Sequence, residues 1–322
     1  MSKKDKVNED ELNGTGAFFY PFLVVVTENS HLNVLSEELQ EPPRPRTRVV
    51  RLIHKIPTGE KILITDDGFV GVFNTNKESA RYLLNTIFAT GVTFGIGSEI
   101  LTSQDICYFT YDDTQKYILI SNSHGPSERT MFAFQRDEAK GEPFYQWQEF
   151  KARAGYHPEM IKKILDTVSD YINNPSIRQD LLLLLEGYTL YYRESYRGAY
   201  LYGWMLIETF LTKLWEEYVQ SLPRSNNDKD SLMDNRSWTS YHHIEMFTAL
   251  GKMDSLVRNL LHALRRKRNN LVHEKRDPDK DEAFWCLRLA ATIILNKLRT
   301  PSEPFSKVND NKLIEYWDLK NE

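Results

Sequence analysis

The chain has 322 residues, of which 41% are hydrophobic and 27% are charged, a composition typical of globular proteins and a length that suits two domains with separate cores. The formal net charge of -4 excludes a protein that is basic over its whole surface, as a general nucleic-acid coat would be, but it allows a local basic cleft. The two cysteines, Cys107 and Cys286, lie far apart, which excludes a disulfide framework and a cysteine-based metal site and fits a reducing cytoplasm.

Residues 1–16, MSKKDKVNEDELNGTG, are polar and lack the apolar stretch of a signal peptide, so we expect them to form a disordered tail. The longest aliphatic run, Leu181–Leu185, is much shorter than the roughly 20 residues that span a bilayer. These features predict a soluble, cytoplasmic protein that does not associate with a membrane.

Residues 17–143 are expected to form a strand-rich α+β domain. Short segments rich in β-branched and aromatic residues, bounded by Gly, Pro, Asn or Asp, predict several strands. One helix is predicted over residues 77–90, with Asn76 as its N-cap and Gly91 as the left-handed residue just past its end. Nothing in these residues identifies what the domain binds.

Residues 144–300 are expected to form an antiparallel bundle of helices. Apolar residues recur at helical spacing through most of this segment, and Pro175 and Pro278 mark helix boundaries. Residues 301–322 are polar and predict a loosely held tail. The predicted fold class is therefore α+β, with a strand-rich N-terminal domain followed by an all-α bundle.

Two features of the helical half carry weaker signals. Glu208 interrupts the apolar run GWMLIETFL, so it either has a buried partner or faces a cleft. His242 and His243 are adjacent and would point about 100° apart on a helix, which makes them poor joint ligands of a metal. The sequence holds no other pattern of metal ligands, and we predict no metal and no other cofactor.

The strongest candidate is the segment LHALRRKRNNLVHEKRDPD, residues 261–279, which is either an ordinary basic surface or part of an active site. A helix from Asp254 to Arg276 would have an apolar face of residues at helical spacing. Arg268 falls within this face, where an arginine is unfavourable unless its charge is paired or faces a wet interface. A solvated basic surface accounts for the neighbouring cations but not for Arg268. The apolar face consists of Val257, Leu260, Leu261, Leu264 and Leu271.

Asn269 and His273 are four residues apart, so their side chains are neighbours on the helix. They stand about 100–140° from Arg268 around the helix axis. One straight helix therefore cannot direct Arg268 and His273 at a single point. Two copies could do so if their helices cross at a dimer axis and each contributes both groups to one cleft. The pattern predicts a homodimer with a composite site.

The fragment RNNLVH, Arg268 to His273, resembles the Arg-x4-6-His signature of the HEPN superfamily, and Asn269 is one of the polar residues that this family prefers after the arginine. The spacing alone is common by chance, but its context is more specific. In this family the motif lies late in a small helical bundle, after a long helix that carries an acidic residue, as Glu208 does here. The resemblance is to the ribonuclease, ApeA-like type and covers residues 144–300.

HEPN proteins of this type are commonly endoribonucleases that need no metal. The resemblance implies that the RNA 2′-OH attacks the adjacent phosphorus and leaves a cyclic phosphate and a free 5′-OH. His273 would act as general base or acid, Arg268 would stabilise charge on the phosphorane, and Asn269 would orient the imidazole or the phosphate. Glu208 would support this site. The residues expected to hold the RNA backbone are Arg265, Arg266, Lys267 and Arg276.

A HEPN bundle can instead be a noncatalytic scaffold that dimerises, holds RNA or recruits a partner, and cations near a helix C-terminus are favoured by the helix dipole in any case. Ribonucleases of this family usually belong to phage-defence or toxin systems, so the resemblance implies that the N-terminal domain controls activation. The expected partners are RNA, a second copy of the chain, and an activator or antitoxin.

Overall fold

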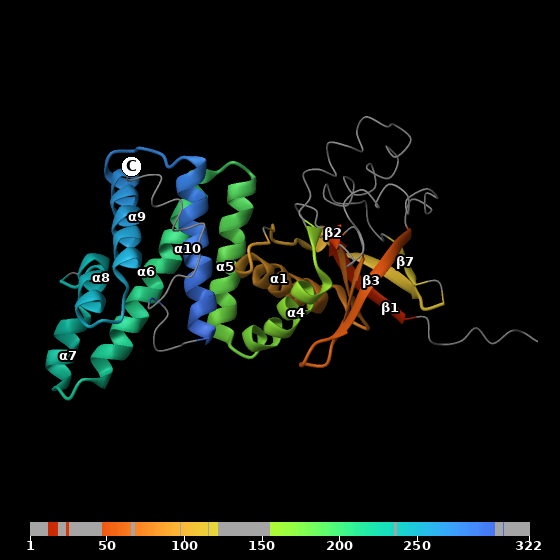
Figure 1. Ribbon diagram of the computed structural model, residues 1–322, viewed down its shortest axis with the longest axis horizontal. Coiled ribbons are helices and arrows are strands. Elements are labelled where there is room, and N and C mark those ends of the chain that lie inside the picture. The colour runs from red at the N-terminus through yellow and green to blue at the C-terminus, as the bar shows by residue number, and fades with distance from the viewer. Residues whose placement is uncertain are drawn as a thin grey trace, which may run out of the picture. The chain divides into compact units, whose positions relative to one another are not determined.

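The computed structural model describes residues 12–18, 24–25, 47–65, 68–96, 98–114, 116–121, 155–234, 237–299 and 305. Its contacts divide the chain into two units: the first comprises Met1–Gly91 and Gly97–Asn173, and the second comprises Val92–Ile96 and Asn174–Glu322. The described strands all lie in the first unit, and the second unit is built from helices (Figure 1). The predicted α+β class is therefore confirmed.

Six of the described strands in the first unit close into an antiparallel barrel. Their order around the barrel is β1-β5-β4-β3-β7-β6, and β1 closes the ring because it pairs with both β5 and β6. Aromatic side chains, including Phe69 and Phe109, fill the interior. The strands are β1 (Leu12–Phe18), β3 (Thr47–Lys55), β4 (Lys61–Thr65), β5 (Phe69–Phe73), β6 (Cys107–Asp112) and β7 (Tyr117–Ser121).

β1 corrects the predicted boundary of the N-terminal tail. The sequence places residues 12–16 in a disordered tail, but they belong to the strand that closes the barrel. Gly14 is a packing requirement here: a Cβ atom at this position would lie 2.4 Å from the Val72 carbonyl oxygen and 2.5 Å from the Phe109 ring. A glycine that gives space to an aromatic ring is indistinguishable in sequence from a glycine in a polar tail. Residues 1–11 lie outside the described residues.

Gly14→Ala is expected to destabilise the protein by about 1–3 kcal/mol, because the added methyl group meets backbone that cannot move aside without disturbing the β1–β5 pairing. Urea-induced unfolding measures this change. Ser121→Ala, at an exposed position at the end of β7, is the control and should change the free energy of unfolding by less than about 0.5 kcal/mol. Equal stability of the two variants would contradict the tight contact.

The helix after β5, α1 (Lys77–Thr93), begins as predicted and ends later than predicted. The Asn76 side chain caps its first turn by accepting a hydrogen bond from the backbone N–H of Ser79, at 2.9 Å. The prediction that Gly91 ends the helix is wrong, because α1 continues to Thr93 and the left-handed residue is Gly95, with φ 85°. Helical propensity locates the element, but two nearby glycines leave its end ambiguous.

The helix α4 (Pro158–Ile172) lies in the first unit, although the sequence groups it with the helical half. It contacts β3, and His54 on that strand approaches the Asp166 carboxylate on α4 at 2.7 Å. The division between the units therefore falls after Asn173, just before the helix that begins at Pro175. The first unit also contains a short parallel pair, β2 (Val24–Val25) with β8 (Gly155–Tyr156), and a 3-10 helix, Ser103–Asp105.

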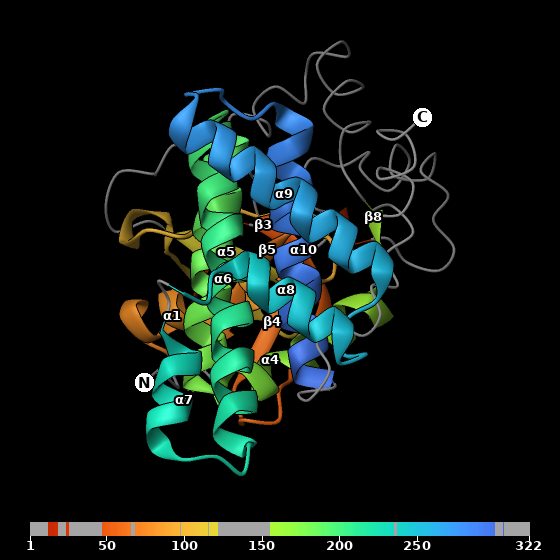
Figure 2. The same cartoon turned by 90° about the vertical axis from the view of Figure 1, so that its left-hand side faces the viewer.

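The second unit places three helices, α6, α8 and α9, in mutual contact (Figures 1 and 2). α6 also packs on α5 and α10, and α6 and α9 are joined by a hydrogen bond in which the Tyr200 hydroxyl donates to the Leu264 carbonyl oxygen, at 2.6 Å. Of residues 300–322, predicted to form a polar tail from 301 onward, only Phe305 is described, and it is buried. The helices are α5 (Pro175–Tyr192), α6 (Tyr196–Ser221), α7 (Asn226–Met233), α8 (Ser240–Ala249), α9 (Ser255–His273) and α10 (Lys280–Arg299).

Candidate functional site

α9 carries most of the residues predicted for the site. The Asp254 side chain caps its N-terminus by accepting a hydrogen bond from the backbone N–H of Leu256, at 2.8 Å. The helix ends at His273 rather than at the predicted Arg276, because Lys275 adopts a left-handed backbone with φ 56°. The predicted apolar face is confirmed, since Val257, Leu260, Leu261, Leu264 and Leu271 are all buried.

A pocket of about 460 Å³ lies between α6, α9 and the start of α8. The residues that α6 contributes are spaced four apart and so lie on one face of that helix. On α9, Arg265 lies three residues before Arg268 and four before Asn269, and the last two are adjacent. The third wall comes from the first turn of α8 and the residues just before it. The lining residues are Trp204, Glu208, Thr212, Trp238, Thr239, Ser240, His243, Arg265, Arg268 and Asn269.

Two guanidinium groups and one carboxylate meet at this pocket. Arg265, Arg268 and Glu208 are half-buried. The Arg268 Nη1 donates to Asn269 Oδ1 at 3.3 Å, and the Arg265 guanidinium lies 5.1 Å from the centre of the Tyr241 ring. Within the described part of the chain, none of the three charged groups forms an ion pair. Guanidinium groups without a carboxylate partner are available to bind a phosphate.

His243 is a buried pocket residue whose importance the sequence does not indicate. Its side chain is 2% exposed, and its ring stacks on Trp215 with the centroids 5.5 Å apart. Neither ring nitrogen has a hydrogen-bond partner among the described residues. Burial, with a smaller contribution from His242, lowers the pKa of His243 to about 4. The ring is therefore neutral at pH 7, with one N–H donor and one acceptor.

This burial predicts a loss of stability in mild acid. Between pH 6.5, the ordinary pKa of histidine, and about pH 4, the pKa of His243 in the folded protein, the unfolded chain binds a proton that the folded chain does not. The stability that the protein owes to a neutral His243 is therefore fully present above pH 6.5. As the pH falls toward 4, the free energy of unfolding decreases by at most about 3 kcal/mol. His243→Phe keeps an aromatic ring on Trp215 but cannot titrate, so its stability should fall less over this range.

Urea unfolding of both proteins at pH 7.0 and pH 4.5 measures the difference. Part of the fall should persist in the variant, because burial also lowers the pKa of His262 and gives it the same sign of pH dependence. Identical pH dependence in wild type and His243→Phe would show that His243 is protonated readily in the folded protein.

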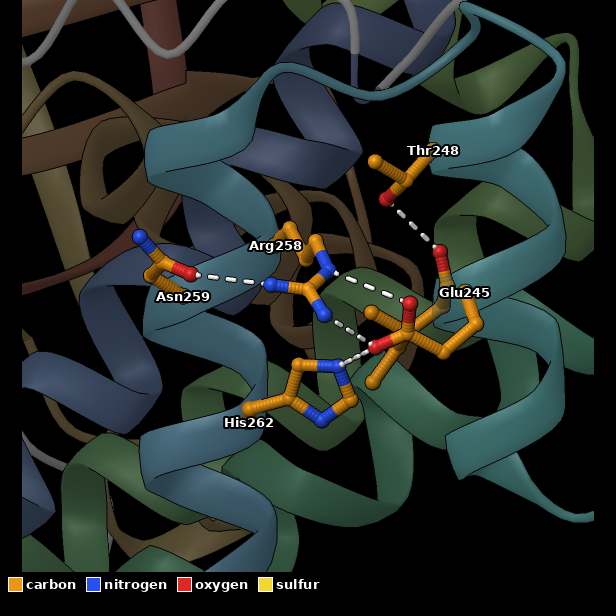
Figure 3. Close-up of polar contacts among 6 residues, drawn as sticks. Glu245, Thr248, Arg258, Asn259 and His262 are labelled. Atoms are coloured by element: carbon orange, nitrogen blue, oxygen red, sulfur yellow. Dashed lines mark hydrogen bonds and ion pairs between the residues drawn. The ribbon is translucent and has the colours of Figure 1, made fainter.

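A charged cluster of Glu245, Arg258 and His262, here called the α8–α9 brace, fixes α8 on α9 (Figure 3). The Glu245 carboxylate accepts hydrogen bonds from Arg258 Nη2 at 2.6 Å and Nε at 3.3 Å, and it lies 2.7 Å from His262 Nε2. The hydrogen bond from Arg258 holds the pKa of Glu245 below its usual range. Because His243 lies two residues from Glu245 on α8, the brace also fixes this wall of the pocket.

His273 and three of the predicted RNA-binding residues do not line the pocket. His273 is exposed in the last turn of α9, and Arg266 and Arg276 are also exposed. Lys267 forms an ion pair with Glu282 of α10. The predicted residues that the structure brings together in the pocket are Glu208, Arg265, Arg268 and Asn269.

The pocket also contains residues that sequence reasoning missed. Trp204 and Thr212 lie four residues before and after Glu208, so a cleft at Glu208 predicts that they line the same wall. Trp238 and His243 had no comparable signal, because they reach the pocket from the residues just before α8 and from α8 itself, whose packing the local sequence does not specify.

Among the described residues, no group of three His, Cys, Asp or Glu side chains is placed to hold a metal ion. None of the described helices combines the length and the apolar character needed to cross a membrane. Comparisons of the chain with models of protein families, with curated proteins and with solved structures found no match.

Proposed function

We propose that the protein is a metal-independent endoribonuclease of HEPN type. The observation that carries the proposal is the position of Arg268: its guanidinium is half-buried in a pocket beside Asn269, without an ion-pair partner among the described residues. A half-buried, permanently charged fork that lacks a carboxylate partner suits an anionic ligand such as the phosphate of RNA. Glu208 lines the same pocket from α6, which supports its proposed role beside Arg268.

The proposed reaction is transfer of the scissile phosphate from the 5′-oxygen to the neighbouring 2′-oxygen. A base removes the proton of the 2′-OH, the 2′-oxygen attacks phosphorus, and the 5′-oxygen leaves and takes up a proton. His273 acts as general base or acid, because an imidazole exchanges protons near neutral pH. Arg268 stabilises the charge on the phosphorane, and Asn269 orients the phosphate or the imidazole. These groups supply both the proton transfer and the positive charge, so the reaction requires no metal.

A second copy of the chain supplies His273 to this site. Within one chain His273 is exposed in the last turn of α9 and does not line the pocket that contains Arg268. Leu201 and Met205 are exposed large apolar residues, and on α6 they precede Glu208 at helical spacing. Val272, also exposed, continues the α9 face that carries Arg268. An apolar surface beside an incomplete site favours a homodimer with composite sites.

The RNA backbone binds to the cations around the pocket. Arg265 lines the pocket, and Arg266 and Arg276 are exposed, so their charges can contact phosphates on either side of the scissile one. Lys267 contributes less than the others, because Glu282 neutralises its charge. We further propose that the enzyme acts in the cytoplasm in phage defence or a toxin system, where the first unit controls activation through an activator or antitoxin.

The test is cleavage of a mixed RNA pool by the purified protein in EDTA. We expect fragments with a 2′,3′-cyclic phosphate and a 5′-OH, identified by end-labelling with and without phosphatase treatment. Binding of RNA without cleavage, together with no toxicity when the chain is overexpressed, would contradict the nuclease and favour the noncatalytic scaffold. The overexpression arm covers the case in which the purified protein lacks its activator.

A further inference from the structure

The pocket between α6, α8 and α9 is larger than a phosphate and a guanidinium require. Its volume of about 460 Å³ falls within the roughly 300–1,000 Å³ of sites that enclose small organic ligands. Arg268 and Asn269 account for one side of it, on α9. Apart from Glu208, the residues of the other walls, on α6 and at the start of α8, have no role in the proposed chemistry.

Aromatic side chains line these remaining walls. Trp204 and Trp238 come from different parts of the chain, and His243 adds a third flat ring. Trp238 stacks on Trp215 with the centroids 4.7 Å apart, and His243 stacks on the same residue, so the rings are held in place by packing behind the pocket. Rigid, flat rings are the usual surface on which proteins stack an unpaired nucleobase.

Polar atoms without partners are concentrated in the same residues. Trp204 Nε1, Arg265 Nε and both ring nitrogens of His243 are buried and have no hydrogen-bond partner among the described residues. Buried polar atoms are nearly always paired in folded proteins, and these enclosed atoms border the cavity, so a small movement of their side chains would offer them to a ligand with matching donors and acceptors. A nucleobase edge offers both kinds of group, whereas an aliphatic ligand offers neither.

The charges lie where a nucleotide would need them. Arg268 suits the phosphate, and Glu208 on the opposite helix can accept hydrogen bonds from the amino or imino groups of a base. A phosphate-binding residue beside a wall of aromatic and hydrogen-bonding side chains suits a nucleotide, whose phosphate and base need these two environments.

We infer that this pocket binds a single nucleotide of the RNA substrate, with its base against the wall to which Trp204, Trp238 and His243 contribute and its phosphate at Arg268. The inference rests on the proposed function, since it assigns the nucleotide to the RNA that the site cleaves. The enzyme would therefore cut next to a preferred base. Unpaired buried donors and acceptors discriminate strongly between bases, because a wrong base leaves them unsatisfied.

The test uses the full chain with His273→Ala, which is expected to prevent cleavage under the proposed mechanism and which lies outside the pocket lining. Binding of the four nucleoside 5′-monophosphates and of ribose 5-phosphate is measured by calorimetry. We expect at least one nucleotide to bind about ten-fold or more tightly than ribose 5-phosphate, with clear differences between the four bases. Equal affinity for all five compounds, or no binding of any, would overturn the inference.

A matched pair of variants locates the binding. Thr212→Phe places a ring in the pocket from α6, and Glu217→Phe adds the same ring at an exposed position of the same helix. Thr212→Phe should abolish the nucleotide preference and Glu217→Phe should retain it. If Thr212→Phe unfolds, as its thermal melt would reveal, Trp238→Leu gives the second reading, with the loss of preference again expected.

The outcomes separate this inference from the proposed function. Cleavage of RNA by the wild type, with no base preference in binding or at the cut sites, would overturn the nucleotide pocket and leave the nuclease standing. Selective nucleotide binding that Thr212→Phe removes, in a protein that never cleaves RNA, would support the pocket and contradict the nuclease.

Discussion

Arg268→Ala is expected to lower the rate of RNA cleavage by about 100- to 1,000-fold, the loss that follows removal of one group that stabilises charge in a transition state. The matched control is Arg266→Ala, which removes the same charge from the same helix two residues earlier, at an exposed position outside the pocket. Its effect should be a modest weakening of RNA binding that depends on salt. Single-turnover kinetics at saturating protein separates the two effects.

Arg268→Lys refines this expectation. Lysine keeps the charge but loses the planar fork that binds two phosphate oxygens together, so its activity should fall between those of the wild type and Arg268→Ala. If Arg268→Ala and Arg266→Ala lose activity equally, the guanidinium in the pocket has no special role, and the basic segment of α9 acts only as a surface that attracts RNA.

Mixing two inactive variants is expected to restore activity if each site is shared between two chains. Arg268→Ala and His273→Ala should each be nearly inactive alone. When the pocket of each chain takes its imidazole from the other chain, a dimer of one variant with the other has one site with both substitutions and one site with neither. An equal mixture should then regain about a quarter of the wild-type activity. Coexpression with two different affinity tags, followed by purification on both, isolates the mixed dimer.

The control for this experiment is a mixed dimer of Arg268→Ala with the double variant Arg268→Ala/His273→Ala, in which no site is intact. It should remain inactive. Isolated mixed dimers of the two single variants that also show no activity would contradict the composite site, and would require Arg268 and His273 to act within one chain or not at all.

Helical periodicity in the sequence located the candidate site because the buried and exposed residues of α9 follow that periodicity. Burial of Leu264 and Leu271 leaves Arg268 half-buried between them, as the spacing predicts. Glu208 was recognisable for a similar reason, since a charge within an apolar helical run must be paired or face an opening, and here it faces the pocket. Local periodicity therefore identified two of the three walls.

The third wall and the barrel depended on contacts that local patterns do not encode. His243 reaches the pocket because the α8–α9 brace holds its helix there, and the brace joins residues 13 and 17 positions apart. Gly14 and Gly16 look like parts of a polar tail until β5 and β6 are placed on either side of β1. The end of α9 was not predicted because the left-handed residue after it is Lys275 rather than a glycine, the residue that usually marks such a position in a sequence.

The early end of α9 means that Arg268 and His273 are held in place to different degrees within one chain. Arg268 lies within α9, the helix that the α8–α9 brace holds against α8. His273 is the last residue of α9, in the final turn, where backbone carbonyl groups lack hydrogen-bond partners within the helix. Under the proposed mechanism, an isolated chain would hold the phosphate-binding Arg268 firmly and the imidazole of His273 loosely. Under that mechanism, dilution of the protein would dissociate the dimer and abolish RNA cleavage, and any event that raises the local concentration of the chain would restore it.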